Sequence, residues 1–264
     1  MIIIYFLIAL LSTTLGALTG MGGGVVIKPA LDMLGSYDSG SISMLSSLTV
    51  LAMSTVSLLF LRKSPDRPKP GMAIALAIGA VIGGNIGSMT LGRFLAGSHA
   101  GSIVTAVQNG VLAVLIVIVF IYTHIKDRLS SPKLESIAPS AVIGFVLGLL
   151  SAFLGIGGGP INVAVIMFLF ALPAKSASIC SLVIIFFSQA SKLGSVAIAG
   201  NLLSYDLSML PAMIGGGVLG GLIGGALHKK VSEKATVALF AGAQVLVFSL
   251  CILNICRSLS LFSI

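Results

Sequence analysis

LTGMGGGVVIKPAL at residues 18–31 and AFLGIGGGPINVAVI at residues 152–166 are the two stretches that decide the fold. Each interrupts an apolar run, 2–34 or 139–172, that is too long for one straight membrane crossing of about 20 residues. Three consecutive glycines disfavour an uninterrupted helix by about 1 kcal/mol each relative to alanine. Both runs are therefore predicted to break in the middle, at Gly22, Gly23 and Gly24 and at Gly157, Gly158 and Gly159.

The composition of the rest of the chain predicts an all-α polytopic membrane protein. Of the 264 residues, 57% are hydrophobic and only 8% are charged, whereas a soluble domain carries about 25% charged residues. The remaining apolar runs are 41–61, 70–91, 101–123, 176–199, 208–227 and 236–256. We expect a multi-pass protein of the inner (plasma) membrane, surrounded by the lipid bilayer. The net charge of +8 does not indicate a nucleic-acid partner, because the cations concentrate in short loops between apolar runs.

The two glycine triplets also indicate an internal duplication. A shift of 135 residues superimposes the triplets, places Gly20 on Gly155 and places Ser46 on Ser181. Glycines at three- and four-residue spacing recur in 79–87 and 215–225, where close packing of helices is the expected role. We expect two repeats, residues 1–134 and 135–264, each with one broken helix followed by three transmembrane helices.

The loop charges bear on the topology. Cations gather in the loops 62–69, 126–133 and 229–234, and the positive-inside rule places all three in the cytoplasm. This is possible if each broken run folds back as a re-entrant hairpin, which inverts one repeat relative to the other and puts the N-terminus outside. The alternative is a kinked crossing at each triplet, with eight helices and parallel halves.

The broken segments predict a central site for an anion. Non-helical backbone at membrane depth survives only beside protein or a water-filled cavity, and helices that resume from Val25 and Ile161 would aim free N–H groups at it. Buried lysines could supply the charge; the alternative roles are helix packing, snorkelling and interhelical hydrogen bonds. The candidate substrate-binding residues are Gly22, Gly23, Gly24, Lys28, Ser46, Gly157, Gly158, Gly159, Asn162, Ser181, Gln189 and Lys192.

The titratable residues argue against an enzyme or a metal site. The acidic residues and histidines lie in loops or at the ends of apolar runs, with Asp32 as a possible exception. No spacing of metal ligands appears, and no cofactor is expected. A proton-driven or cation-binding site would normally keep a carboxylate at mid-membrane, so a small anionic substrate is the better expectation.

The two quoted stretches resemble the signature of the sulfite exporter TauE/SafE family, a G-x-G-G-G-x-x-x-x-P-type element near the start of each half. In the second half Ala164 stands where Pro29 stands in the first. The resemblance covers essentially the whole chain. It implies transport of sulfite, sulfonate, thiosulfate or related organosulfur and carboxylate anions. The alternative from another class is a non-transporting membrane scaffold or assembly subunit, and the oligomeric state is left open.

Overall fold

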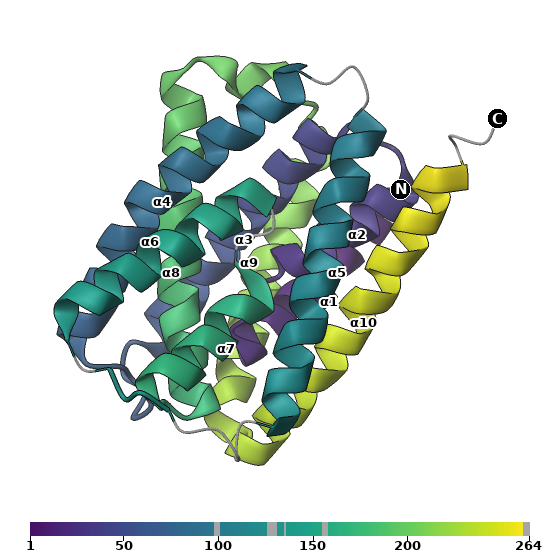
Figure 1. Ribbon diagram of the computed structural model, residues 1–264. Coiled ribbons are helices and arrows are strands. Elements are labelled where there is room, and N and C mark those ends of the chain that lie inside the picture. The colour runs from purple at the N-terminus through teal and green to yellow at the C-terminus, as the bar shows by residue number, and fades with distance from the viewer. Residues whose placement is uncertain (98–100, 126–130, 135, 155–157, 261–264) are drawn as a thin grey trace.

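The computed structural model describes residues 1–97, 101–125, 131–134, 136–154 and 158–260 (Figure 1). This part of the chain is helical and holds no strand, which confirms the predicted all-α class. Eight of its helices are long and apolar enough to cross a membrane; the two short ones are α2 and α7. The elements are α1 (Ile2–Thr19), α2 (Gly24–Leu34), α3 (Ser39–Leu61), α4 (Pro70–Gly97), α5 (Gly101–Ile125), α6 (Ile137–Leu154), α7 (Gly159–Phe170), α8 (Ala174–Ile198), the 3₁₀ turn η2 (Asn201–Ser204), α9 (Leu210–Lys230) and α10 (Glu233–Ser260).

The glycine triplets lie at breaks between helices. Gly20 ends α1 in the left-handed conformation, with φ 75°, and α2 begins at Gly24, one residue earlier than expected. In the second half α7 begins at Gly159, two residues before the expected Ile161. Pro160 occupies its first turn, where a missing N–H costs nothing. Gly157 lies outside the described residues.

The chain folds back at both breaks. The ring of Tyr5, near the start of α1, meets the ring of Tyr37, just after α2, in an edge-to-face contact of 5.8 Å between centroids. The N–H of Leu134, before α6, donates to the carbonyl of Leu169 near the end of α7, at 2.9 Å. Each broken segment therefore enters and leaves at the same end of the bundle, as a hairpin does. The internal repeat and the cellular side of each end stay predictions.

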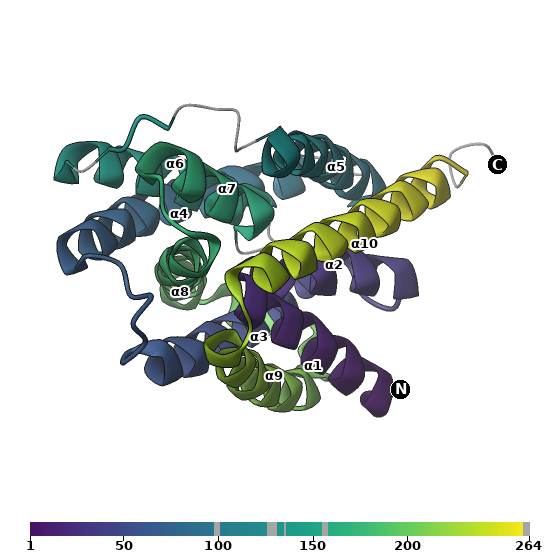
Figure 2. The ribbon, with the colours of Figure 1, turned by 90° about the horizontal axis from the view of Figure 1, so that it is seen from below.

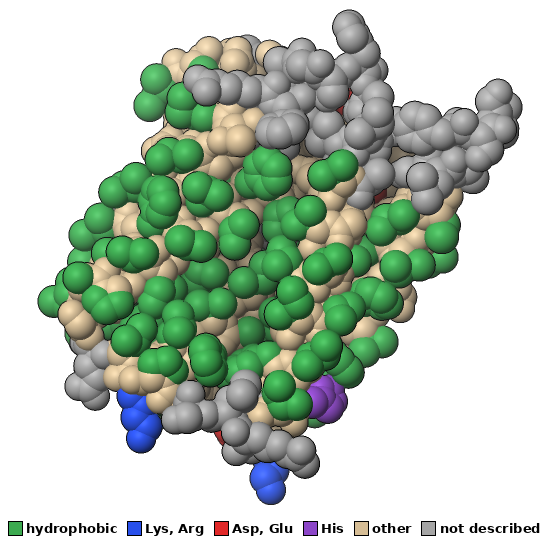
Figure 3. Space-filling view, in the orientation of Figure 1, with side chains coloured by type: hydrophobic (Ala, Val, Ile, Leu, Met, Phe, Trp, Pro, Cys, Tyr) green, Lys and Arg blue, Asp and Glu red, His purple; other side chains and the backbone are tan. Residues whose placement is uncertain are grey.

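The cationic loops 62–69 and 229–234 share one end of the bundle. Lys175, at the start of α8, pairs with Asp66 of the α3–α4 loop at 3.2 Å, and Lys229 lies 4.1 Å above the ring of Phe60. The Lys and Arg side chains visible in Figure 3 project from the lower end of a flank covered with hydrophobic side chains. This arrangement is the one that the positive-inside rule favours.

Small residues allow the closest helix contacts. A Cβ on Gly79 of α4 would lie 2.6 Å from the backbone nitrogen of Phe145 on α6. On the other side of the bundle, a Cβ on Gly216 of α9 would lie 2.6 Å from the carbonyl oxygen of Phe6 on α1. Figure 2 shows the α4–α6 pair and the α1–α9 pair on different sides of the bundle. The expected packing role of these glycine stripes is therefore confirmed, since such residues let backbones approach.

Candidate functional site

The first break obtains its hydrogen-bond donors from α8. Ser178 Oγ donates to the carbonyl of Thr19 at 2.7 Å, and Ser181 Oγ donates to the carbonyl of Gly20 at 2.5 Å. The last carbonyls of a helix lack partners within it, so these two serines complete the end of α1. Ser181 thus has a structural partner in this conformation, and its contact with substrate stays a prediction.

The second break obtains its donors from the first half of the chain. Lys28 Nζ donates to the carbonyl of Leu154, the last residue of α6, at 3.1 Å and also to Gln108 Oε1. Gln108 Nε2 donates to the carbonyl of Phe153 at 3.0 Å. The carbonyl end of a helix carries a partial negative charge, so a buried ammonium is stabilised there. Each break is completed by side chains of the opposite half.

The two breaks also meet each other. A Cβ on Gly159, which has φ 59°, would lie 2.5 Å from the Cγ2 atom of Val25. The first turns of α2 and α7 are therefore in contact, although the two glycine triplets are 135 residues apart in the sequence. Because the first N–H groups of a helix lack intrahelical partners, this junction brings two anion-attracting helix ends together.

Lys192 is a buried cation with only neutral partners. Its ammonium donates to Ser43 Oγ at 2.8 Å, to Ser47 Oγ at 2.7 Å and to the carbonyl of Ser43 at 3.4 Å. The side chain is 5% exposed, so it does not snorkel to the surface. Within the described ranges no carboxylate forms a salt bridge with it. Several kcal/mol is the usual cost of burying an ion, and here no opposite charge offsets it.

Three of the predicted site residues carry buried polar atoms without hydrogen-bond partners in the described part of the chain. These atoms are Ser46 Oγ, both amide atoms of Gln189, and Asn162 Nδ2. Ser46 adjoins Ser47 on α3, and Gln189 lies one turn before Lys192 on α8, so both belong to the seam where these helices pack. Buried groups of this kind are rare in native structures and call for a water molecule or a ligand.

The predicted residues thus fall into separate groups. Ser46, Gln189 and Lys192 lie along the α3–α8 seam. Asn162 lies beside Gly158, where an added Cβ would meet its amide, and Lys28 lies at the end of α6.

Sequence reasoning missed several polar partners of the two lysines. These are Ser43 and Ser47 for Lys192 and Gln108 for Lys28; Asn109, which donates to Asp32, was missed as well. Ser43 and Ser47 are four residues apart, the spacing of one helix face, which was the signal available for them. Gln108 and Asn109 are adjacent polar residues in an otherwise apolar run.

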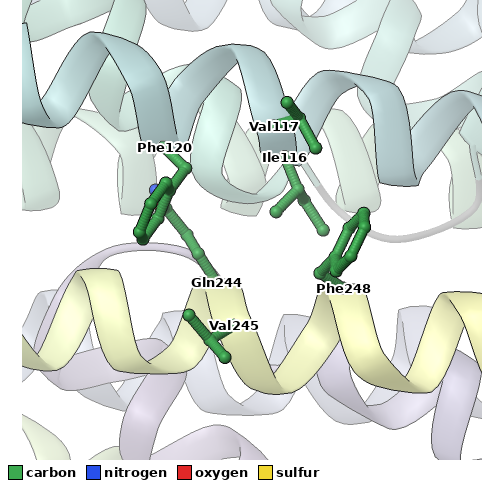
Figure 4. A pocket seen from close by; sticks show the side chains of 6 residues that line it. All are labelled: Ile116, Val117, Phe120, Gln244, Val245 and Phe248. Atoms are coloured by element: carbon green, nitrogen blue, oxygen red, sulfur yellow. The ribbon is translucent and has the colours of Figure 1, made fainter.

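An apolar pocket lies away from these residues, between α5 and α10. It has a volume of about 210 Å³ and is lined by Ile116, Val117, Phe120, Gln244, Val245 and Phe248 (Figure 4). No lining residue is charged, and Val117 and Val245 are 41% and 53% exposed on the apolar flank. This pocket therefore suits an apolar occupant rather than an anion. Among the described residues there is also no group of three or more side chains that could hold a metal ion.

Comparison with known proteins agrees with the resemblance noted in the sequence. The family model described as "Sulfite exporter TauE/SafE" matches residues 5–250. The "Probable membrane transporter protein YunE" of Bacillus subtilis (strain 168) is 27% identical over 271 aligned residues. The alignment covers 93% of this chain and 95% of that relative.

Proposed function

Because the chain belongs to the sulfite exporter TauE/SafE family of membrane transporters, we propose that it carries a small anion across the plasma (inner) membrane. The proposed substrates are sulfite, sulfonates, thiosulfate or related organosulfur and carboxylate anions. The observation that carries the proposal is the buried, uncompensated ammonium of Lys192 beside the unpartnered groups of Ser46 and Gln189.

The chemistry of this seam suits an oxyanion. The charge of Lys192 would be neutralised by the substrate, and the hydroxyl of Ser46 and the amide of Gln189 would each gain a hydrogen bond. Hydrogen bonds to a charged group contribute about 1.5–3 kcal/mol each. Sulfite and sulfonate groups present three oxygens, so one such group can accept from several convergent donors at once.

The junction of the two breaks supplies a second element of the proposed path. The helix ends of α2 and α7 offer N–H groups and a partial positive charge, and Asn162 adds an amide beside them. In this proposal the glycines of both triplets keep that backbone accessible, while Lys28 adds positive charge from the end of α6. An anion would thus meet donors without meeting a fixed carboxylate in the α3–α8 seam.

Flux measurements in proteoliposomes test the proposal. Purified protein should carry sulfite, thiosulfate or methanesulfonate faster than empty liposomes do. Lys192→Met should abolish this flux without lowering thermal stability, since it removes a buried charge and retains an apolar side chain of similar length. The matched control is Lys230→Met, at an exposed position at the end of α9, which should transport normally.

Two results would count against the proposal. Flux equal to that of empty liposomes for all three anions would favour the scaffold alternative, in which the glycines only pack helices. Normal flux by Lys192→Met would remove the α3–α8 seam from the path.

A further inference from the structure

A second charged cluster, formed by Lys28 and Asp32, joins α2 to α5 near the last turn of α2. Asp32 follows Lys28 by one helical turn, and its Oδ2 accepts a hydrogen bond from Asn109 Nδ2 at 3.3 Å. Lys28 is buried, while Asp32 is only half-buried and precedes the exposed Met33 and Leu34. The carboxylate therefore lies between the buried ammonium and the end of the bundle.

The surroundings of this cluster are narrow and hold few other titratable groups. Its crevice is lined by Lys28, Pro29, Gln108, Asn109, Leu112 and Leu154 and is too narrow to admit a water molecule. The helices α1 and α3 carry no charged side chain within their bounds. From α10, Cys251 faces both Asp32 and Lys28, and Arg257 donates to the carbonyl of Met33.

This cluster lies against the helices of the α3–α8 seam. Ile27 and Leu31 of α2 pack in one apolar cluster with Ile42 and Leu45 of α3 and with Ile185 of α8. The Lys28–Asp32 pair on α2 is therefore close to both helices that form the seam. With Asp32 ionised, Lys28, Asp32 and Lys192 together carry a net charge of one positive unit; with Asp32 protonated, they carry two. Because Coulomb energy rises with the charge of the bound ion, protonation of Asp32 favours a dianion most, and a dianion neutralises the protonated set.

We propose that Asp32 is the proton-binding group that couples anion transport to proton movement, with Lys28 transmitting its charge state to the α3–α8 seam. This proposal rests on the proposed function. A proton binds one carboxylate oxygen of Asp32 on one side of the membrane, accompanies the anion, and is released on the other side. Binding linkage is reciprocal, so the bound anion raises proton affinity as much as the proton raises anion affinity.

The test separates coupling from transport. Thiosulfate is the main probe because it stays a dianion over the working pH range. Proteoliposomes with the membrane potential clamped at zero are used for two measurements: thiosulfate exchange at equal pH, and thiosulfate accumulation against a pH gradient. Coupling of one proton to each anion predicts about tenfold accumulation for each unit of pH difference.

The variants make the assignment specific. Asp32→Asn should retain exchange, lose accumulation driven by the pH gradient, and bind thiosulfate with an affinity that depends less on pH than that of the wild type. Asp32→Glu should restore coupling. The matched control, Asp206→Asn, removes a carboxylate from a loop at the same end of the bundle, where Asp206 contacts Ser41, and should stay coupled.

Several outcomes would overturn the proposal. Accumulation of thiosulfate by Asp32→Asn under a pH gradient would overturn it. Exchange by the wild type without gradient-driven accumulation would also overturn it, although anion transport itself would then stand. Absence of any wild-type exchange would remove the proposed function as well. If Asp32→Asn fails to accumulate in the membrane, the wild-type protein still offers a refutation: thiosulfate binding that does not tighten as pH falls would overturn the proposal.

Discussion

Gly158→Ala is the substitution for which the structure gives the clearest energetic prediction. Gly158 precedes α7 with φ 105° and ψ −47°, a conformation that L-residues rarely adopt. A Cβ built there would lie 2.7 Å from Ser151 Oγ and would overlap the amide of Asn162. The change therefore combines backbone strain with a steric clash at the second break.

The two costs can be added. Backbone strain of this kind costs about 1–3 kcal/mol, and overpacking a filled interior costs about 1–3 kcal/mol. The expected loss is then about 2–6 kcal/mol, a large part of a total stability of about 5–15 kcal/mol. We expect Gly158→Ala to unfold at a clearly lower temperature and to lose transport as well.

Gly194→Ala is the matched control. Gly194 lies inside α8, and no atom approaches within 4 Å of its ideal Cβ position. Alanine in a helix interior is favoured over glycine by up to about 1 kcal/mol, so this variant should be at least as stable as the wild type. The assay is the fraction of detergent-solubilised protein that survives heating, measured by size-exclusion chromatography.

Equal melting temperatures for Gly158→Ala and the wild type would refute this reasoning. If the prediction holds, loss of transport in Gly158→Ala cannot distinguish a ligand role of the glycine from a packing role, because the variant also loses stability. The same is true of Gly23, whose added Cβ would lie 2.7 Å from Cγ2 of Thr13. Lys192→Met separates the two roles better, because it removes charge without adding volume.

Two further predictions concern topology and affinity. In a background lacking Cys180, Cys251 and Cys256, cysteines at Ser131 and Ser232 should be labelled from the same side of the membrane; labelling from opposite sides would contradict the hairpins. Lys28→Gln should raise the concentration of anion needed for half-maximal flux more than it lowers the maximal rate, since it removes charge while keeping a hydrogen-bond donor. If the dependence of flux on anion concentration is unchanged, Lys28 only completes the end of α6 and does not contribute to anion affinity.

The breaks were predictable from sequence because their cause is local. Three consecutive glycines oppose a helix wherever they occur, and an apolar run longer than one crossing must accommodate the break inside the membrane. The loop charges then predicted a hairpin at each break. All the cationic loops can lie at one end only if each broken segment leaves on the side from which it entered. The burial of Ser46, Gln189 and Lys192 follows from their place inside apolar segments, where polar groups are costly; their contact with substrate stays a prediction.

The partners of these residues were not predictable, because they depend on how helices far apart in sequence align. Lys28 and Gln108 are separated by 80 residues, and Lys192 and Ser43 by 149. Apolar helices match one another in many registers, so the sequence does not select one. The serines that complete the end of α1 show the same limit: Ser181 was predicted for the substrate and is bonded to Gly20.

The positions of the two lysines suggest why the halves differ in charge although their glycines agree. In the alignment of the halves, Lys28 faces Val163 and Lys192 faces Ser57. A strictly duplicated site would bury four ammonium groups, and each would cost several kcal/mol. One lysine from each half buries two cations and leaves the equivalent positions neutral. Of the two, only Lys28 has a carboxylate one turn away, so protonation of Asp32 changes the net charge of the Lys28–Asp32 pair, whereas Lys192 has only neutral partners among the described residues.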